Sequence, residues 1–200
     1  MKLSIAHLLL LALAVSSACA QTQPSASTWQ GQTEVAGEYT WVHSNAPPAE
    51  CGCFSLNGGS GEIARTFYSG YSAFVFDTTV VHAAGISPAG YDLTLSVFTA
   101  GYRFRPAPHE RWNPYGQVLL GGEHASGTLV QGNTPAASDP GVVFAMNIGG
   151  GIDRRLGDHW WLRLVDADYM MTSTSNRTND LQNNVRISTG LVYRFGHSHP

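Results

Sequence analysis

Lysine is almost absent from this 200-residue chain: Lys2 is the only one, and all the other basic residues are arginines. Two explanations are open: a biased genome composition, which is the simpler one, or a confined site that needs the planar, bidentate arginine side chain. Charged residues of both signs make up only 12% of the chain, about half the usual share. The formal net charge of −3 leaves no basic surplus, so we expect no nucleic-acid partner.

Long apolar runs are also missing beyond residue 20, so no later segment matches the roughly 20 residues of a membrane-spanning helix. The first 20 residues are different. Lys2 precedes an apolar stretch over residues 8–15, and the small residues Ala-Cys-Ala follow at 18–20. This order predicts a cleaved secretory signal peptide over residues 1–20, and therefore an exported chain.

Two alternatives to cleavage after residue 20 are open. Cys19 could carry a lipid, but Ser16 stands where lipoprotein signals have an aliphatic residue. The segment could also stay in place as a membrane anchor, but its apolar core is short for a span. We expect cleavage, with residues 21–31 as a polar lead-in to the folded domain.

Cysteine is scarce as well: Cys51 and Cys53 are the only two beyond the expected signal peptide. An exported protein meets an oxidising compartment, so this pair can close a small disulfide across Gly52. Free thiols and a bound metal are the alternatives, although zinc sites space paired cysteines by about two to four residues and add further ligands.

No catalytic constellation is evident in the sequence. A lipid hydrolase or acyltransferase would need an activated serine, and the nearest cluster is Ser126 with His124 and Glu123. His124 and Ser126 share one face of an extended strand, whereas Glu123 lies on the other, so no triad geometry follows. We therefore expect no catalytic residues, no cofactor and no metal.

What the sequence has instead is alternation with a period of two residues, in eight segments separated by turn residues. These segments span residues 33–43, 58–68, 71–84, 91–104, 114–126, 141–155, 159–172 and 183–195. Nothing between them is long enough to be a linker between domains. The pattern predicts one all-β domain over residues 32–196, followed by a short tail over 197–200.

The two faces of these segments differ in kind. In the last one, Val185, Ile187 and Leu191 share one face, and Arg186 and Arg194 share the other. A soluble barrel needs large apolar side chains inside, whereas a membrane barrel has them outside, around a polar interior and between aromatic girdles. Because the second face is small, polar or charged in strand after strand, the pattern predicts an eight-stranded antiparallel up-and-down transmembrane β-barrel, closed so that no sheet edge meets lipid.

Three stretches carry a resemblance to a known family. The last strand ends in GLVYRF, FAMNIGGGIDRRLGDHWWLRLVDADY covers residues 144–169, and CFSLNGGSGEIA covers residues 53–64. They resemble the last, the sixth and seventh, and the second strands of small eight-stranded outer-membrane β-barrels similar to the OmpA transmembrane domain. The resemblance implies that the protein resides in the cell outer membrane, in contact with its lipid. It also implies that Tyr193 and Phe195 belong to a C-terminal signal read by the barrel-assembly machinery during biogenesis.

Only five residues follow Phe195, too few for the periplasmic peptidoglycan-binding domain that some members of this family carry. We therefore expect a structural or surface-interaction role for a monomeric barrel. A narrow small-solute channel is the alternative, although eight strands leave an interior just wide enough for side chains to fill. A lipid-modifying enzyme is a third and less favoured reading.

Alternation also directs six charged side chains into the predicted interior: Glu38, Glu62, Asp77, Asp153, Arg163 and Arg186. An isolated charge is costly in so narrow a space, so we expect a paired network that plugs the lumen. Separate solvation of each charge by water is the alternative. The first and last strands adjoin in a closed barrel, which brings Glu38 within reach of Arg186. The family resemblance implies a second pair, between Glu62 and Arg163.

The seventh segment breaks strict alternation. If Arg163 points inside, regular alternation would turn Asp166 and Asp168 towards lipid. One extra residue near Val165, a β-bulge, returns both carboxylates to the interior because an offset of one residue reverses every later side chain. The alternative is that both aspartates lie above the membrane.

Overall fold

The computed structural model describes residues 31–44, 54–67, 70–86, 90–128, 141–174 and 181–195. The expected signal peptide, nearly all of the lead-in, Cys51, Cys53 and the tail lie outside these ranges. Eight strands make up most of the described chain: β1 Thr33–Ser44, β2 Phe54–Phe67, β3 Ser72–Ile86, β4 Tyr91–Phe104, β5 Trp112–Ser126, β6 Val142–Arg155, β7 Trp160–Thr172 and β8 Gln182–Phe195.

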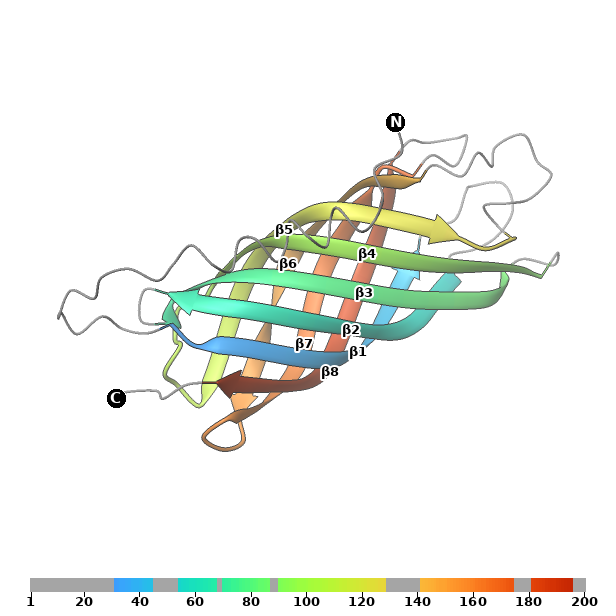
Figure 1. Ribbon diagram of the computed structural model, residues 1–200. Helices are drawn as coiled ribbons and strands as arrows, with labels where there is room; N and C mark the ends of the chain where they lie inside the picture. The colour runs from blue at the N-terminus through green and yellow to red at the C-terminus, as the bar shows by residue number, and fades with distance from the viewer. Residues whose placement is uncertain are drawn as a thin grey trace, which may run out of the picture.

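These strands form a single closed barrel (Figure 1). Each strand pairs antiparallel with the next, and β1 also pairs with β8, from Thr33 opposite Phe195 to Ser44 opposite Asn184. The predicted eight-stranded up-and-down barrel is therefore confirmed. Within the part of the chain that the structure describes, no helix is long and apolar enough to cross a membrane.

The strand bounds lie within two residues of those expected, except that β2 begins at Phe54 instead of residue 58. Residues 54–57 pair with the last four residues of β1. Gly58 and Gly59, where the strand was expected to begin, lie inside it. A Cβ at Gly58 would stand 2.0 Å from the carbonyl oxygen of Val80 on β3, so glycine here permits a close approach of two strands.

Side chains alternate between the outer surface and the interior along every strand. In β8, Val185, Ile187 and Leu191 are 40–47% exposed, whereas Arg186 and Arg194 are at most 5% exposed. Large apolar and aromatic side chains cover the outer surface: Val35, Tyr39, Ile63, Phe74, Phe76, Val80, Phe98, Tyr102, Phe104, Trp112, Val118, Leu120, Phe144, Ile148, Trp160, Leu164, Tyr169, Ile187, Leu191 and Phe195 among them. Such a surface is suited to lipid and not to water.

Connection lengths orient the barrel. At the end where β1 begins and β8 ends, the strands are joined by residues 68–71, 105–111 and 156–159; at the other end, three of the connections are longer, over 45–53, 127–141 and 173–181. Transmembrane barrels have short periplasmic turns and longer extracellular loops. The end that holds Thr33 and Phe195 is therefore the periplasmic one, although the short β3–β4 connection departs from this rule.

A β-bulge interrupts β7, as predicted. The register of β7 against β8 shifts between Arg163 and Asp166. Leu164 and Val165 both lie on the outer surface, and Asp166 and Asp168 are buried inside. The extra residue thus keeps two carboxylates out of lipid.

Candidate functional site: the barrel interior

Charged side chains are concentrated inside the barrel. Five arginines and eight carboxylates are at most 8% exposed: Arg103, Arg105, Arg163, Arg186, Arg194, Glu34, Glu38, Glu62, Asp77, Glu123, Asp153, Asp166 and Asp168. All of them except Glu123, which lies near the extracellular end of β5, form what we call the charged layer. A buried charge is tolerated only where partners compensate its lost hydration, so the contacts of the arginines define this layer.

Glu62 on β2 lies between two arginines from distant strands. Its Oε1 accepts a hydrogen bond from Nη1 of Arg103 at 2.7 Å, and its Oε2 contacts Nη2 of the same guanidinium. Nη1 of Arg163 lies 3.0 Å from Oε2. Arg103 is on β4 and Arg163 on β7, so this one carboxylate joins three strands that are not neighbours. The contact between Glu62 and Arg163 that the resemblance implied is present.

Arg163 binds two further carboxylates. Its Nε donates to Oδ1 of Asp153 at 3.0 Å, and its Nη1 donates to Oε1 of Glu38 at 2.5 Å. Gly190 of β8 stands opposite both Arg163 and Glu38 in the strand register. A Cβ at Gly190 would lie 2.9 Å from Cγ of Glu38, so the missing side chain gives these two charged groups room to meet.

The expected contact between Glu38 and Arg186 is wrong. The two residues are on neighbouring strands, but Arg186 stands opposite Val42, nearer the extracellular end of β1 than Glu38. Arg186 donates instead to Asp77 at 2.8 Å and to Asp168 at 2.6 Å. Closure of the barrel determines which strands meet, but the register between them decides which side chains do.

Gln117 connects the contacts around Glu62 with the contacts around Arg186. Its Oε1 accepts a hydrogen bond from Nε of Arg103 at 3.0 Å, and its Nε2 donates to the carboxylates of Asp166 and Asp168 at 3.1 and 3.3 Å. Gly149 stands opposite both Gln117 and Asp168. Here too a glycine leaves space over its strand for polar side chains to reach across.

Aromatic rings complete the periplasmic part of the layer. Glu34 lies 2.5 Å from Nη2 of Arg105 and 3.0 Å from Nε of Arg194. The guanidinium carbon of Arg194 lies 3.8 Å from the ring centroid of Trp161. Tyr115 offers its ring in the same way to three arginines of the charged layer, at 4.3, 5.0 and 6.0 Å. Cations stacked on desolvated rings are held by the ring quadrupole as well as by carboxylates.

Apart from Glu123, uncharged side chains fill the interior towards the extracellular end. Neutral polar residues come first: Thr40, Ser60, Thr79, Thr99, Asn147 and Ser188. The hydroxyl oxygen of Thr40 lies 2.8 Å from that of Ser60 and 2.9 Å from that of Ser188. Beyond them is a buried hydrophobic cluster, called the apolar layer here: Val42, Leu56, Val81, Ala83, Ile86, Leu93, Leu95, Val97, Ala125, Ala145 and Met170.

The apolar layer departs from the small or polar interior that the sequence predicted. In β4, Leu93, Leu95 and Val97 are buried inside, while Thr94 and Ser96 lie on the outer surface. The usual order of a membrane strand is thus reversed near its extracellular end. The apolar outer band of such barrels is only about 25 Å tall, so strand ends beyond it can carry polar residues outside and apolar residues inside.

All six charged residues predicted for the interior are buried there. The predicted set left out five others, which obey the same alternation: Glu34, Arg103, Arg105, Glu123 and Arg194. Arg194, for example, stands between the outward rings of Tyr193 and Phe195. Every one of the five buried arginines lies within 4 Å of a carboxylate, which is the use of arginine that a confined site requires.

Tyr193 and Phe195 lie on the outer surface at the periplasmic end. Their ring centroids are 4.6 Å apart in an edge-to-face arrangement, and Trp160 of β7 packs on Tyr193 at 4.9 Å. This cluster forms part of an aromatic girdle. Recognition of the two residues by the assembly machinery stays a prediction.

The residues considered as a catalytic cluster do not come together. His124 donates from Nδ1 to the carbonyl oxygen of Gly141 on the outer surface, whereas Glu123 accepts from the hydroxyl of Thr174 inside the barrel. Within the described strands and turns, no three or more His, Cys, Asp or Glu side chains are grouped so that they could hold a metal ion.

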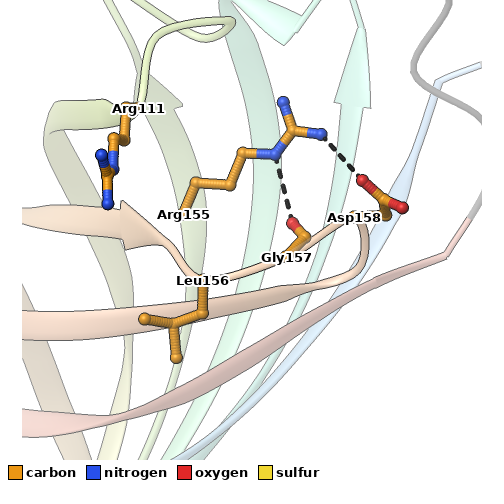
Figure 2. A pocket seen from close by; sticks show the side chains of 5 residues that line it. All are labelled: Arg111, Arg155, Leu156, Gly157 and Asp158. Carbon is orange, nitrogen blue, oxygen red and sulfur yellow. Dashed lines mark hydrogen bonds and ion pairs between the residues drawn. The ribbon is translucent and has the colours of Figure 1, made fainter.

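A hollow of about 380 Å³ lies at the periplasmic end, between the turns that precede β5 and follow β6 (Figure 2). It is lined by Arg111, Arg155, Leu156, Gly157 and Asp158. The side chain of Arg155 is engaged in its own turn, with Nε donating to the Gly157 carbonyl at 3.1 Å and Nη2 3.2 Å from Asp158. Because the Asp158 side chain is 91% exposed, this ion pair is weak, and the hollow is a feature of the turn.

A closed barrel with an apolar outer surface, aromatic residues near the strand ends and buried charges inside is a transmembrane β-barrel of the outer-membrane class. The family comparison agrees with this. The chain belongs to the outer membrane protein β-barrel domain family, whose model matches residues 9–195, and it is an outer-membrane protein. A comparison with curated proteins finds no match.

Solved structures of outer-membrane proteins have a similar fold. Neisserial surface protein A superposes with a TM-score of 0.58 at 13% identity, covering 82% of this chain and 97% of its own. OprG of Pseudomonas aeruginosa also gives 0.58, at 11% identity, with 84% and 97% covered. The attachment invasion locus protein Ail of Yersinia pestis, in complex with the heparin analogue sucrose octasulfate, gives 0.55 at 16% identity, with 84% and 100% covered. At these identities the likeness is one of fold.

Proposed function

We propose that the protein is a monomeric, non-conducting outer-membrane barrel with a structural or surface-contact role, and that its own side chains plug the lumen. The observation that carries the proposal is the contact of Glu62 with both Arg103 and Arg163, at 2.7 and 3.0 Å, across the barrel. A carboxylate held from opposite sides of the lumen leaves no open path along the axis at that height. Bidentate contacts of arginine with carboxylate are also among the stronger polar contacts.

The apolar layer supports the proposal independently. An ion that passed the charged layer would next meet Val42, Leu95 and Met170, which are at most 4% exposed. Stripping water from an ion in an apolar constriction is costly. Two layers of opposite character would thus block ions by two different means.

Because a plugged barrel does not conduct, we assign it a function in surface contact at its extracellular end. One structural relative, Ail, is by name an attachment protein and was solved with a heparin analogue. It is a precedent for surface contact by a barrel of similar fold. The described residues bring together no catalytic constellation that would favour a lipid-modifying enzyme instead.

The plug is tested by planar-bilayer recording of the purified, refolded protein. We expect no discrete current steps from the wild type. A matched variant, Arg163→Ala, removes a side chain that contacts Glu38, Glu62 and Asp153, and we expect it to stay closed as long as the apolar layer is intact. Stable steps from the wild type, in protein whose gel mobility shows the heat-dependent shift of a folded barrel, would refute the plug.

A narrow cation channel is the second candidate. The observation that favours it is the excess of carboxylates inside, with eight buried acidic side chains and five arginines. An acidic lumen attracts cations and repels anions. Steps that carry potassium but not chloride would identify this function in the same recordings.

A further inference from the structure

Three histidines lie in one row on the outer surface near the extracellular end: His43 on β1, His82 on β3 and His124 on β5. His43 stands opposite Ser55 of β2, whereas His82 stands opposite Asn57, two residues away on the same strand. The same step of two residues separates Thr94, opposite His82, from Ser96, opposite His124. Because the strands of a closed barrel are tilted to its axis, this stagger brings the three histidines to a similar height. We call these three residues the outer histidine row. They stand on alternate strands, with hydroxyl side chains between them.

Each imidazole is oriented by a hydrogen bond at Nδ1 with an adjacent strand or its flank. The Nδ1 of His43 lies 3.3 Å from the Ser55 hydroxyl, and the Nδ1 of His82 lies 3.0 Å from the Thr94 hydroxyl. The Nδ1 of His124 lies 3.1 Å from the carbonyl oxygen of Gly141. Trp41 stacks on His43 with ring centroids 5.5 Å apart. No hydrogen bond with another described residue engages Nε2 of these rings, so each Nε2 can bind a partner outside the barrel.

The row lies where the apolar outer band ends. One alternation step nearer the middle of the barrel, Val80 and Phe98 are 49% and 47% exposed on the outer surface. The phosphate-bearing headgroups of membrane lipids lie at this border between hydrocarbon and water. Polar side chains at this level therefore meet headgroups directly.

Permanent positive charge is missing from this level in the described part of the chain. The described arginines lie inside the barrel, as Arg186 does, or near the periplasmic end, as Arg65 and Arg154 do. Of the described residues on the outer surface at the extracellular end, only the histidines can become positive. Imidazole is the side chain whose charge changes at mildly acidic pH.

We propose that the outer histidine row binds the phosphate groups of the glycolipid in the outer leaflet, and that protonation at mildly acidic pH strengthens this binding. The chemistry is a charge-assisted hydrogen bond from Nε2–H to a phosphate oxygen. No covalent change is involved. The occupant is a phosphorylated lipid, because a row spread over alternate strands matches headgroups packed side by side around the barrel.

His124 is the residue that makes the contact depend on pH. A carbonyl oxygen can only accept, so Nδ1 of His124 carries the proton that it donates to Gly141. In the neutral ring Nε2 then has a lone pair and cannot donate to phosphate. Protonation places a hydrogen on Nε2 and reverses the interaction. The hydroxyl partners of His43 and His82 can donate to Nδ1, so these two rings can present Nε2–H even when neutral.

Among the residues that the structure describes, few charges near the row oppose this. Asp92 of β4 is close enough to His82 for their charges to interact, and its carboxylate already accepts hydrogen bonds from Thr128. His43 faces Trp41 and Ser55, and His124 faces Ser96 and Val142 by register. Because Asp92 partly neutralises protonated His82, we expect His43 and His124 to contribute more to phosphate binding at low pH.

The test uses the full mature chain refolded in zwitterionic micelles and titrated with bis-phosphorylated glycolipid. Binding is followed through the imidazole Cε1–H resonances at two pH values, about 5.5 and 7.5, between which imidazole in general changes its charge. We expect the dissociation constant to be about tenfold lower at the acidic pH, the scale of one added charge-assisted hydrogen bond. His124→Gln should lose most of this pH dependence, and the triple His→Gln variant of the row should lose all of it.

His159 supplies the matched control, because its Nδ1 also bonds a backbone carbonyl, that of Arg194 at 3.0 Å, but at the periplasmic end. His159→Gln should keep the tenfold effect. The heat-dependent mobility shift checks that each variant is folded. The proposal is overturned if the triple variant keeps the pH dependence, if His159→Gln removes it, or if the dephosphorylated glycolipid shows the same tenfold change.

Discussion

The two ends of the barrel interior are filled by different means. Towards the periplasm, arginines and carboxylates from β1, β2, β4, β6, β7 and β8 meet in shared hydrogen bonds. Towards the outside, aliphatic side chains such as Leu95 and Met170 pack with no polar contact between them. Thr40, with its two hydroxyl partners, belongs to the boundary between these regions.

This difference indicates that two kinds of force hold the barrel closed. The charged layer depends on complementarity, because removing one partner leaves a buried charge without compensation. The apolar layer depends on volume, since its members are interchangeable as long as the space is filled. Single substitutions should therefore lower the free energy of unfolding more in the charged layer than in the apolar layer.

The largest effect is expected for Arg163→Met, in the charged layer. This change leaves Glu38 and Asp153 without the guanidinium that contacts both, and it should lower the free energy of unfolding by about 3–5 kcal/mol. Urea unfolding in lipid vesicles measures it. Arg65→Met is the control: Arg65 is exposed and donates to Thr33 at 2.7 Å, so its loss should be within about 0.5 kcal/mol. Equal losses would remove the distinction between buried and exposed arginines.

A smaller loss is expected in the apolar layer for Leu95→Ala. We expect about 2–3 kcal/mol, at the low end for a buried Leu→Ala change, because flexible Met170 of the same cluster can move into the space. The same unfolding assay applies. Leu120→Ala, on the outer surface at 49% exposure, should cost less because lipid can fill the gap. If Leu95→Ala lowered the free energy of unfolding as much as Arg163→Met, the two layers would be equally sensitive to single substitutions.

Gly190→Ala tests the space that lets Arg163 reach Glu38. The added Cβ would lie 2.2 Å from the carbonyl oxygen of Gly37 and 2.7 Å from Cα of Glu38, so the backbone must shift. Overpacking of this kind costs about 1–3 kcal/mol. Gly37→Ala is the control, since nothing lies within 4 Å of its Cβ position. We expect the control to unfold at the wild-type urea concentration, and a control as unstable as Gly190→Ala would contradict the steric argument.

The smallest effect is expected at the boundary, for Thr40→Val. This substitution removes hydrogen bonds to Ser60 and Ser188 at 2.8 and 2.9 Å while it keeps the volume. The lost hydrogen bonds join neutral hydroxyl groups, which contribute little net stability, so the free energy of unfolding should fall by about 1 kcal/mol. Thr78→Val on the outer surface should change the unfolding free energy by less. A loss as large as that of Arg163→Met would mean that the boundary is as sensitive to single substitutions as the charged layer.

Alternation alone predicts the strands, the facing of their side chains and the bulge at Val165, because a closed barrel in lipid allows few exceptions to the two-residue period. It also places Glu62 and Arg163 inside. It does not give the register between strands, and for that reason the pairing of Glu38 with Arg186 is wrong. The apolar layer was missed for another reason, since Leu95 is read as lipid-facing unless the depth of its position is known.

The central claim is that the interior charges act as one coupled network, and a double-mutant cycle on Glu62→Gln and Arg163→Met tests it most directly. The unfolding free energies of the wild type, the two single variants and the double variant are measured in lipid vesicles. For two groups in direct contact within a buried network, we predict an interaction energy of about 2 kcal/mol. A coupling of zero within error, with both single variants folded, would mean that each charge is solvated separately and that the network does not exist.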